Sequence, residues 1–120
     1  MAKNILVVDK TSFNRAMIKN NLTKAGYNVV AEAGDGRTAI EQFIIHSPDL
    51  VVMEIQLPEA DGIEALKVMK AINPEALVIM CSAAGQQKKV LEAFKAGAKD
   101  FLVKPIQPDR LIESVEACIG

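Results

Sequence analysis

Hydrophobic residues along the chain gather into five short runs, which are separated by longer stretches of helical character. Four of the runs are continuous, which is typical of strands buried on both faces of a parallel sheet, and the second run alternates with polar or small residues. The runs predict strands over residues 5–8, 27–33, 50–53, 77–80 and 101–103. The stretches between and after them predict helices over residues 12–25, 35–46, 62–72, 86–96 and 108–118.

The limits of these helices follow from local signals. In the first helix Phe13, Met17, Ile18 and Leu22 recur near helical spacing, and Gly26 is a stop signal. Similar cap, break and stop signals bound the later helices: Asp35-Gly36, Asp61, Asn73-Pro74, Gly97 and Pro108. Five alternating strand and helix units predict an α/β fold with a doubly wound, five-stranded parallel sheet.

Polar residues mark the carboxyl end of four of the predicted strands. Asp9 follows the first strand, Glu54 the third, Ser82 the fourth and Lys104 the fifth. Parallel strands point the same way, so these ends share one edge of the sheet, where open α/β sheets bind ligands. The sequence therefore predicts two carboxylates, one hydroxyl and one ammonium group in a single crevice.

Composition narrows the class of protein. The chain has 120 residues and a formal net charge of −1, so we expect one domain over residues 1–120 and neither nucleic-acid nor membrane-surface binding. No apolar run is long enough for a signal peptide or a membrane span, which predicts a cytoplasmic protein. The spacing of Cys81 and Cys118 suggests neither a disulfide framework nor a zinc site. His46, the only histidine, lies in the last turn of a helix, so catalysis by histidine is not expected.

Almost the whole chain resembles the receiver domain of response regulators, the CheY-like module of two-component signalling. The matching segments, in order, are Leu6-Val7-Val8-Asp9, Pro48-Asp49-Leu50-Val51, Leu57-Pro58, Asp61-Gly62, Cys81-Ser82-Ala83, Gly97-Ala98-Lys99-Asp100-Phe101 and Lys104-Pro105. The resemblance implies a flavodoxin-like (βα)5 fold with strand order 2-1-3-4-5. It also implies that the chain is not an enzyme but a stand-alone receiver domain. Its partner would be a separate signalling protein, either a histidine kinase or a downstream target. The implied contact face is formed by the fourth helix, fifth strand and fifth helix, over residues 86–95, 101–104 and 107–116.

In that family a strand-three aspartate accepts phosphate, and an acidic pair helps it to hold Mg²⁺. Asp9 matches the first acid of the pair, and Ser82 and Lys104 match the hydroxyl and lysine that contact the phosphoryl oxygens. Phe101 matches the aromatic residue that reorients. Two positions depart from the pattern, because the second acid is Lys10 and the phosphate acceptor is Glu54.

These two departures change the expected chemistry. Lys10 removes a metal ligand and repels Mg²⁺, and two lysines then balance the two carboxylates without a metal. The hypothesis is that an internal ammonium replaces the metal, with Lys10 paired to Glu54 or to Asp9. No cofactor is then expected; any metal would fall to Asp9, Glu54 and Gln56. The predicted function is an atypical receiver that is independent of phosphorylation and Mg²⁺ and acts by protein–protein interaction.

Two alternatives stay open. The first is a Mg²⁺-dependent, phosphoryl-accepting regulator with weakened chemistry, since the Glu54 carboxylate lies one carbon–carbon bond, ~1.5 Å, farther out than that of aspartate, and a misplacement of ~1 Å can cost about a hundredfold in rate. The second is a small dinucleotide-binding domain. Residues 34–39, GDGRTA, match G-x-G-x-x-A, and Glu54 lies 20 residues after Gly34. The position of this motif in the second unit, and the short chain, favour a turn and a helix cap instead.

Overall fold

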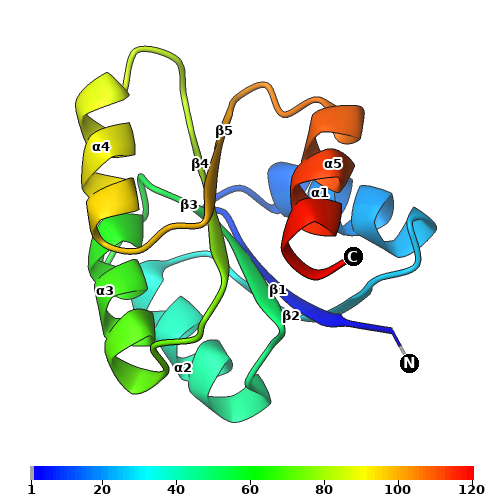
Figure 1. Cartoon of the computed structure of the whole chain (residues 1–120), viewed down its shortest axis with the longest axis horizontal. Coiled ribbons are helices and arrows are strands. Elements are labelled where there is room, and N and C mark those ends of the chain that lie inside the picture. Colours follow the sequence, from blue (N-terminus) through cyan, green and yellow to red (C-terminus); the bar gives the residue numbers. More distant parts are fainter. Residues whose placement is uncertain (1) are drawn as a thin grey trace.

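A computed structural model describes residues 2–120, with the side chain of Gln87 left aside. Five strands and five helices alternate along the chain (Figure 1). The strands are β1 (Asn4–Val8), β2 (Asn28–Ala33), β3 (Leu50–Glu54), β4 (Val78–Ser82) and β5 (Asp100–Val103). The helices are α1 (Ser12–Lys24), α2 (Gly36–His46), α3 (Gly62–Ile72), α4 (Gln87–Lys95) and α5 (Pro108–Ile119). Each element lies within about two residues of its predicted limits.

The five strands form one parallel sheet in the order β2-β1-β3-β4-β5, which confirms the predicted fold class. The central strand β3 pairs with β1 through Val52 and Val7, and with β4 through Val52 and Ile79. All residues of β3 and β4 are buried, as their continuous apolar runs predict. The strand order reverses between β1 and β3, so the carboxyl ends of these two strands flank the switch point of the sheet.

Helices cover both faces of the sheet. Figure 1 shows α2, α3 and α4 on one side and α1 and α5 on the other. One hydrophobic cluster joins Leu6 and Met53 of the sheet to Phe43 and Leu66 of the first layer of helices. A second cluster joins the opposite sheet face to α1 and α5, and its buried leucines and isoleucines are Ile5, Ile18, Leu22, Leu50, Ile79, Leu102, Ile106 and Leu111. Burying both faces of the sheet in this way supplies the main favourable term in folding.

Side-chain caps fix where three of the helices begin. Thr11 accepts a hydrogen bond from the Asn14 N–H ahead of α1, Asp35 caps α2 and Asp61 caps α3. The caps at Asp35 and Asp61 are the ones that the sequence predicts.

The GDGRTA segment has a structural role at the start of α2. The Gly36 N–H donates to the Pro58 carbonyl at 3.1 Å, and a Cβ at Gly36 would collide with the Ala60 carbonyl. The chain itself therefore closes the helix N-terminus where a dinucleotide would need access to free N–H groups. Gly36 is required for a close backbone approach, and the dinucleotide-binding alternative loses its main support.

Hydrogen bonds to the Asp100 carboxylate join helix α5 to β5. The Asp100 carboxylate accepts hydrogen bonds from the buried Ser114 hydroxyl at 2.5 Å, from the Phe101 N–H at 2.8 Å and from Arg110 at 3.2 Å. Burial alone would raise the pKa of Asp100, but these three donors outweigh it and hold the pKa below its usual value of 3.8.

Replacing Asp100 by asparagine is expected to destabilise the protein in a pH-dependent way. Because the folded-state pKa of Asp100 is depressed, its contribution is present above pH 3.8 and is lost as the pH falls through the folded value. Urea unfolding of both proteins between pH 7 and pH 2.5 measures this. The wild-type advantage should be largest at pH 7 and should shrink in acid; an advantage that stays constant with pH would contradict the assignment.

Candidate functional site

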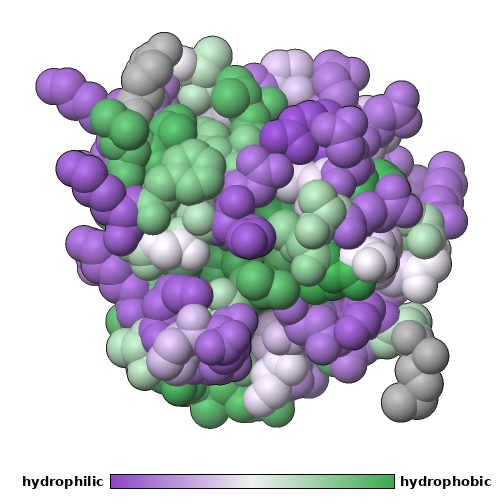
Figure 2. All heavy atoms as spheres, viewed as in Figure 1, coloured by the Kyte–Doolittle hydropathy of each residue, from purple (hydrophilic) through white to green (hydrophobic). Residues whose placement is uncertain are grey.

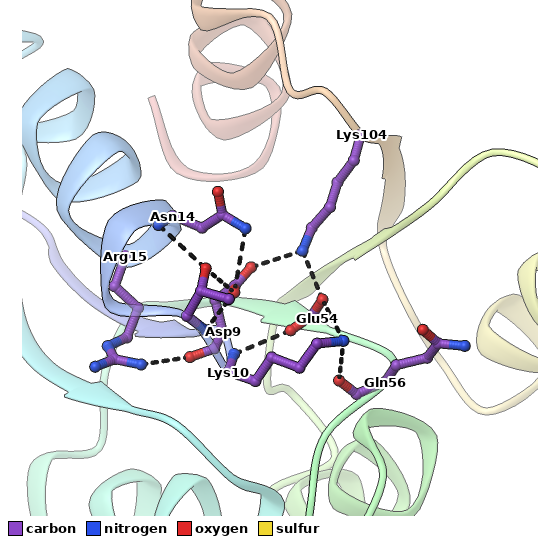
Figure 3. Close-up of polar contacts among 8 residues, drawn as sticks. Asp9, Lys10, Asn14, Arg15, Glu54, Gln56 and Lys104 are labelled. Carbon is purple, nitrogen blue, oxygen red and sulfur yellow. Dashed lines mark hydrogen bonds and ion pairs between the residues drawn. The ribbon is translucent and has the colours of Figure 1, made fainter.

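The predicted polar residues meet at the carboxyl edge of the sheet. A hollow of about 220 Å³ opens there, between the loop after β1, the end of β3 and the loops after β4 and β5. It is lined by Lys10, Thr11, Asn14, Glu54, Gln56, Ser82, Ala83 and Lys104. Figure 3 shows how the charged side chains converge beside it.

Lys104 bridges the two carboxylates. Its Nζ lies 2.9 Å from Asp9 Oδ2 and 2.5 Å from Glu54 Oε2. The Asp9 side chain is 1% exposed and that of Glu54 is 6% exposed, so both charges have left water almost completely. Buried carboxylates need a paired charge, and Lys104 reaches in from the end of β5 to provide it to both.

Lys10 is the second cation on Glu54. Its backbone N–H donates to Glu54 Oε1 at 2.9 Å, and its Nζ lies 3.4 Å from Glu54 Oε2 and 3.4 Å from the Gln56 carbonyl oxygen (Figure 3). Of the two partners that the sequence left open for Lys10, the structure selects Glu54. The Lys10 side chain is 43% exposed, so this longer contact is weaker than that of Lys104.

Asp9 is held by neutral donors as well as by Lys104. Its Oδ1 accepts from the Thr11 N–H at 2.9 Å, from the Thr11 hydroxyl at 3.2 Å and from the Asn14 amide at 3.4 Å. Burial raises the pKa of Asp9, but the bonds from Lys104, Thr11 and Asn14 prevail, and the pKa lies below 3.8. Sequence reasoning missed Thr11 and Asn14. The only available signal was their position in the first turn after a strand that ends on an acid.

Lys104 stays charged over a wide pH range. Burial would lower its pKa, yet its bonds to Glu54 and Asp9 raise the pKa above the usual 10.5. The Asp9–Lys104 pair is therefore fully ionised between the lowered pKa of Asp9 and the raised pKa of Lys104. Its contribution to stability is lost as the pH falls below 3.8 or rises through the folded-state pKa of Lys104.

The two remaining predicted site residues lie near this cluster without joining it. Ser82 ends β4, is buried and lines the hollow, but no hydrogen bond among residues 2–120 links its side chain to Glu54. Phe101 lies in β5, is half-buried and packs against the hydrophobic cluster between the sheet and the helices α2, α3 and α4.

The oxygens that a metal would need already accept from ammonium groups. Glu54 Oε2 contacts both lysines, Asp9 Oδ2 contacts Lys104, and the Gln56 carbonyl contacts Lys10. Within the described chain, no three His, Cys, Asp or Glu side chains gather in a metal-binding arrangement. Mg²⁺ prefers oxygen ligands in near-ideal octahedral geometry, and a lysine beside the pair of carboxylates does not fit it.

Comparison with known proteins agrees with this architecture. The chain matches the family described as response regulator receiver domain over residues 5–116. It is 56% identical to the chemotaxis protein CheY of Bacillus subtilis over 120 residues, which covers 100% of each chain. It is 51% identical to the chemotaxis protein CheY of Thermotoga maritima over 115 residues, 96% of each chain. A chain of the crystal structure of the CheX–CheY–BeF3–Mg²⁺ complex from Borrelia burgdorferi matches with a TM-score of 0.93 at 31% identity, covering 98% of this chain and 90% of that one.

None of the helices in the part of the chain that the structure describes is long and apolar enough to cross a membrane. The fold, the order of the strands, the polar residues at their carboxyl ends and the similarity over nearly the full chain all agree. The chain belongs to the response regulator receiver domain family and is a CheY-like receiver of chemotaxis two-component signalling.

Proposed function

We propose that this receiver works as an interaction module that needs neither Mg²⁺ nor phosphorylation, with residues 1–120 acting as one domain. One observation carries the proposal: the Lys10 ammonium contacts both the Glu54 carboxylate and the Gln56 carbonyl, two oxygens that could otherwise serve as ligands of a divalent cation. CheY-like receivers are signalling proteins rather than classical enzymes, and the proposed role involves no reaction on a substrate. The predicted cytoplasmic location is part of the proposal.

The charges and lone pairs of the cluster around Glu54 support independence from Mg²⁺ and phosphorylation. Two ammonium groups balance the carboxylates of Asp9 and Glu54, so the cluster is neutral without a metal. Both oxygens of Glu54 already accept hydrogen bonds, Oε1 from the Lys10 N–H and Oε2 from the two lysine side chains. A carboxylate held in this way is a poor nucleophile toward a negatively charged phosphoryl group, because its lone pairs are engaged and the proposed metal-free site has no divalent cation to offset the repulsion.

The Glu54 carboxylate makes one of the two contacts that a phosphoryl group would make at this site. In receivers the lysine and the hydroxyl both contact the phosphoryl oxygens; here the Glu54 carboxylate reaches Lys104 but is not bonded to Ser82 among the described contacts. Such a carboxylate can bias the protein toward one state only through contacts that differ between the states. The bond to Lys104 is the contact that we propose acts in this way.

The output would pass through a protein surface. CheY and CheX assemble in the Borrelia burgdorferi complex, so related receivers contact other signalling proteins. For this chain we propose the face of α4, β5 and α5, where Leu91, Phe94 and Val103 are exposed. Figure 2 shows hydrophobic side chains gathered over α4 and β5 with hydrophilic ones around them. Lys88, Lys89, Lys95 and Arg110 on this face are balanced by Glu92, Asp109, Glu113 and Glu116, so we propose that the exposed apolar side chains rather than net charge make the contact.

An NMR titration tests the proposal. Amide spectra of the wild-type protein are recorded with Mg²⁺ up to millimolar concentrations, with and without beryllofluoride. The Borrelia burgdorferi CheY serves as the positive control, since its complex contains both ligands. We expect no saturable shifts at Asp9 or Glu54 and no beryllofluoride-dependent change at Ser82 or Phe101. Saturable Mg²⁺ shifts followed by a beryllofluoride response would overturn the proposal and favour the phosphoryl-accepting regulator.

A further inference from the structure

A single peptide group links the cluster to an arginine outside it. The Asp9 carbonyl accepts a hydrogen bond from Arg15 Nη1 at 2.6 Å, and the N–H of the same peptide, which belongs to Lys10, donates to Glu54 Oε1 at 2.9 Å. The carbonyl and N–H of a trans peptide point in opposite directions, so the group lies between a guanidinium on one side and a carboxylate on the other. Figure 3 shows this chain of contacts from Arg15 to Glu54.

The position of Arg15 is itself fixed from two sides. Its Nε donates to Glu32 Oε1 at 3.2 Å, which ties α1 to β2. Gly34 leaves room for the guanidinium, because a Cβ at that position would lie 3.2 Å from Arg15 Nη1. The Arg15 side chain is only 20% exposed, so its bond to the Asp9 carbonyl is partly shielded from water and is stronger than a bond at the surface.

Glu54 depends on this peptide more than on its other partners for orientation. The two lysine side chains both contact Glu54 Oε2, whereas Glu54 Oε1 accepts its hydrogen bond from the Lys10 N–H. A backbone donor is a more rigid partner than a lysine that is 43% exposed. If the Asp9–Lys10 peptide turned, Glu54 would keep its charge partners but would lose the contact that sets the plane of its carboxylate.

We infer that Arg15 is a positioning residue of the site, which holds the Asp9–Lys10 peptide so that its N–H fixes the Glu54 carboxylate. The guanidinium also polarises the peptide, which strengthens the N–H as a donor to Glu54. This inference rests on the proposed function only in giving the oriented carboxylate a signalling role. The contact chain from Glu32 through Arg15 to Glu54 then ties the exposed edge at β2 to the buried cluster.

Three variants test the inference in Mg²⁺-free buffer: Arg15→Gln, Arg15→Lys and Glu32→Gln. In Arg15→Gln we expect the Lys10 amide to exchange with solvent deuterium roughly tenfold faster, because the bond that holds its peptide is lost. The carboxyl carbon-13 resonance of Glu54 should shift at the same time. Arg15→Lys should restore most of both signals, since an ammonium can donate to the same carbonyl. Glu32→Gln should change them by less than about twofold, because the glutamine oxygen can still accept the hydrogen bond from Arg15 Nε.

The exchange of the Val52 amide, in the centre of the sheet, separates positioning from a general loss of stability. A tenfold change at Lys10 with Val52 nearly unchanged supports the inference. An unchanged Lys10 amide in Arg15→Gln, or equal acceleration at Lys10 and Val52, would overturn it. Because no Mg²⁺ is present, a wild-type protein that later proves to bind Mg²⁺ would overturn the proposed function without affecting this result.

Discussion

Replacing Lys104 by methionine is expected to lower the free energy of unfolding at pH 7 by about 3–5 kcal/mol, the usual cost of removing one partner from a buried ion pair. Lys104 is the cation that both carboxylates share, with Asp9 and Glu54 only 1% and 6% exposed. After the substitution the donors left to the Asp9 carboxylate within residues 2–120 are the neutral groups of Thr11 and Asn14. Glu54 keeps Lys10, whose Nζ is 3.4 Å away and whose side chain is 43% exposed.

Urea unfolding measures this loss, with Lys99→Met as the control because Lys99 is an exposed lysine of the loop before β5. The deficit should narrow as the pH falls, since the pKa of Asp9 is lowered partly by Lys104 and rises when Lys104 is absent, so that protonation then relieves the unpaired charge. The double variant Lys104→Met with Glu54→Gln should recover part of the stability. A loss below about 1 kcal/mol, similar to that of a surface ion pair, would mean that the cluster is far better hydrated than its burial indicates.

The fold and most of the charged cluster were predictable. The fold depends on the pattern of apolar residues, and the cluster depends on where the parallel strands end. Continuous apolar runs identify strands covered on both faces, and the rule that parallel strands end at one edge brings Asp9, Glu54 and Lys104 together from positions far apart in the sequence. Charge balance predicted that Lys10 pairs with Glu54 or with Asp9, and the structure selects Glu54. The structure adds that the contact uses the backbone N–H of Lys10 as well as its side chain.

The rest of the site was missed because it depends on the exact path of the loop after β1. Thr11 donates its backbone N–H and Asn14 its side-chain amide to the Asp9 carboxylate, and Arg15 donates to the Asp9 carbonyl. Nothing in the spacing of these residues distinguishes them from an ordinary helix start. Apolar spacing has a similar limit. Phe13 belongs to the pattern that predicts the first helix, yet its side chain is 76% exposed because α1 turns that position away from the sheet.

The GDGRTA segment shows how a sequence motif can arise from packing alone. A glycine, a cap and a helix start are the elements of a phosphate-binding turn, and the same elements serve a close approach between two loops of one chain. Gly36 lies against Ala60 and donates to Pro58, so its lack of a side chain serves contact with the chain itself. Only the position of neighbouring backbone, which the sequence does not reveal, distinguishes the two uses.

Replacing Lys10 by aspartate is expected to create a Mg²⁺ site, which we propose the wild-type protein lacks. The change frees the Gln56 carbonyl and removes one of the two ammonium contacts of Glu54 Oε2, leaving that of Lys104. It also adds a third carboxylate and takes the formal charge of the cluster from zero to −2, which one Mg²⁺ neutralises. Two unit charges ~4 Å apart interact by ~4 kcal/mol at an effective dielectric of about 20. Even after screening at the exposed position of Lys10, Mg²⁺ should bind at least about a hundredfold more tightly, or ~2.7 kcal/mol.

The melting temperature and the amide spectrum of Lys10→Asp should therefore depend on Mg²⁺ in a saturable way, because a ligand that binds only the folded state stabilises it. Two variants separate the causes. Lys10→Gln removes the ammonium without adding a ligand and should gain much less, and Lys88→Asp makes the same change in net charge on an exposed residue of α4 and should gain nothing. If Lys10→Asp failed to respond, the ammonium would not be what excludes the metal, and the longer side chain of Glu54 would be the remaining cause. An equal response from Lys10→Gln would show instead that repulsion alone keeps Mg²⁺ out, with no third carboxylate required.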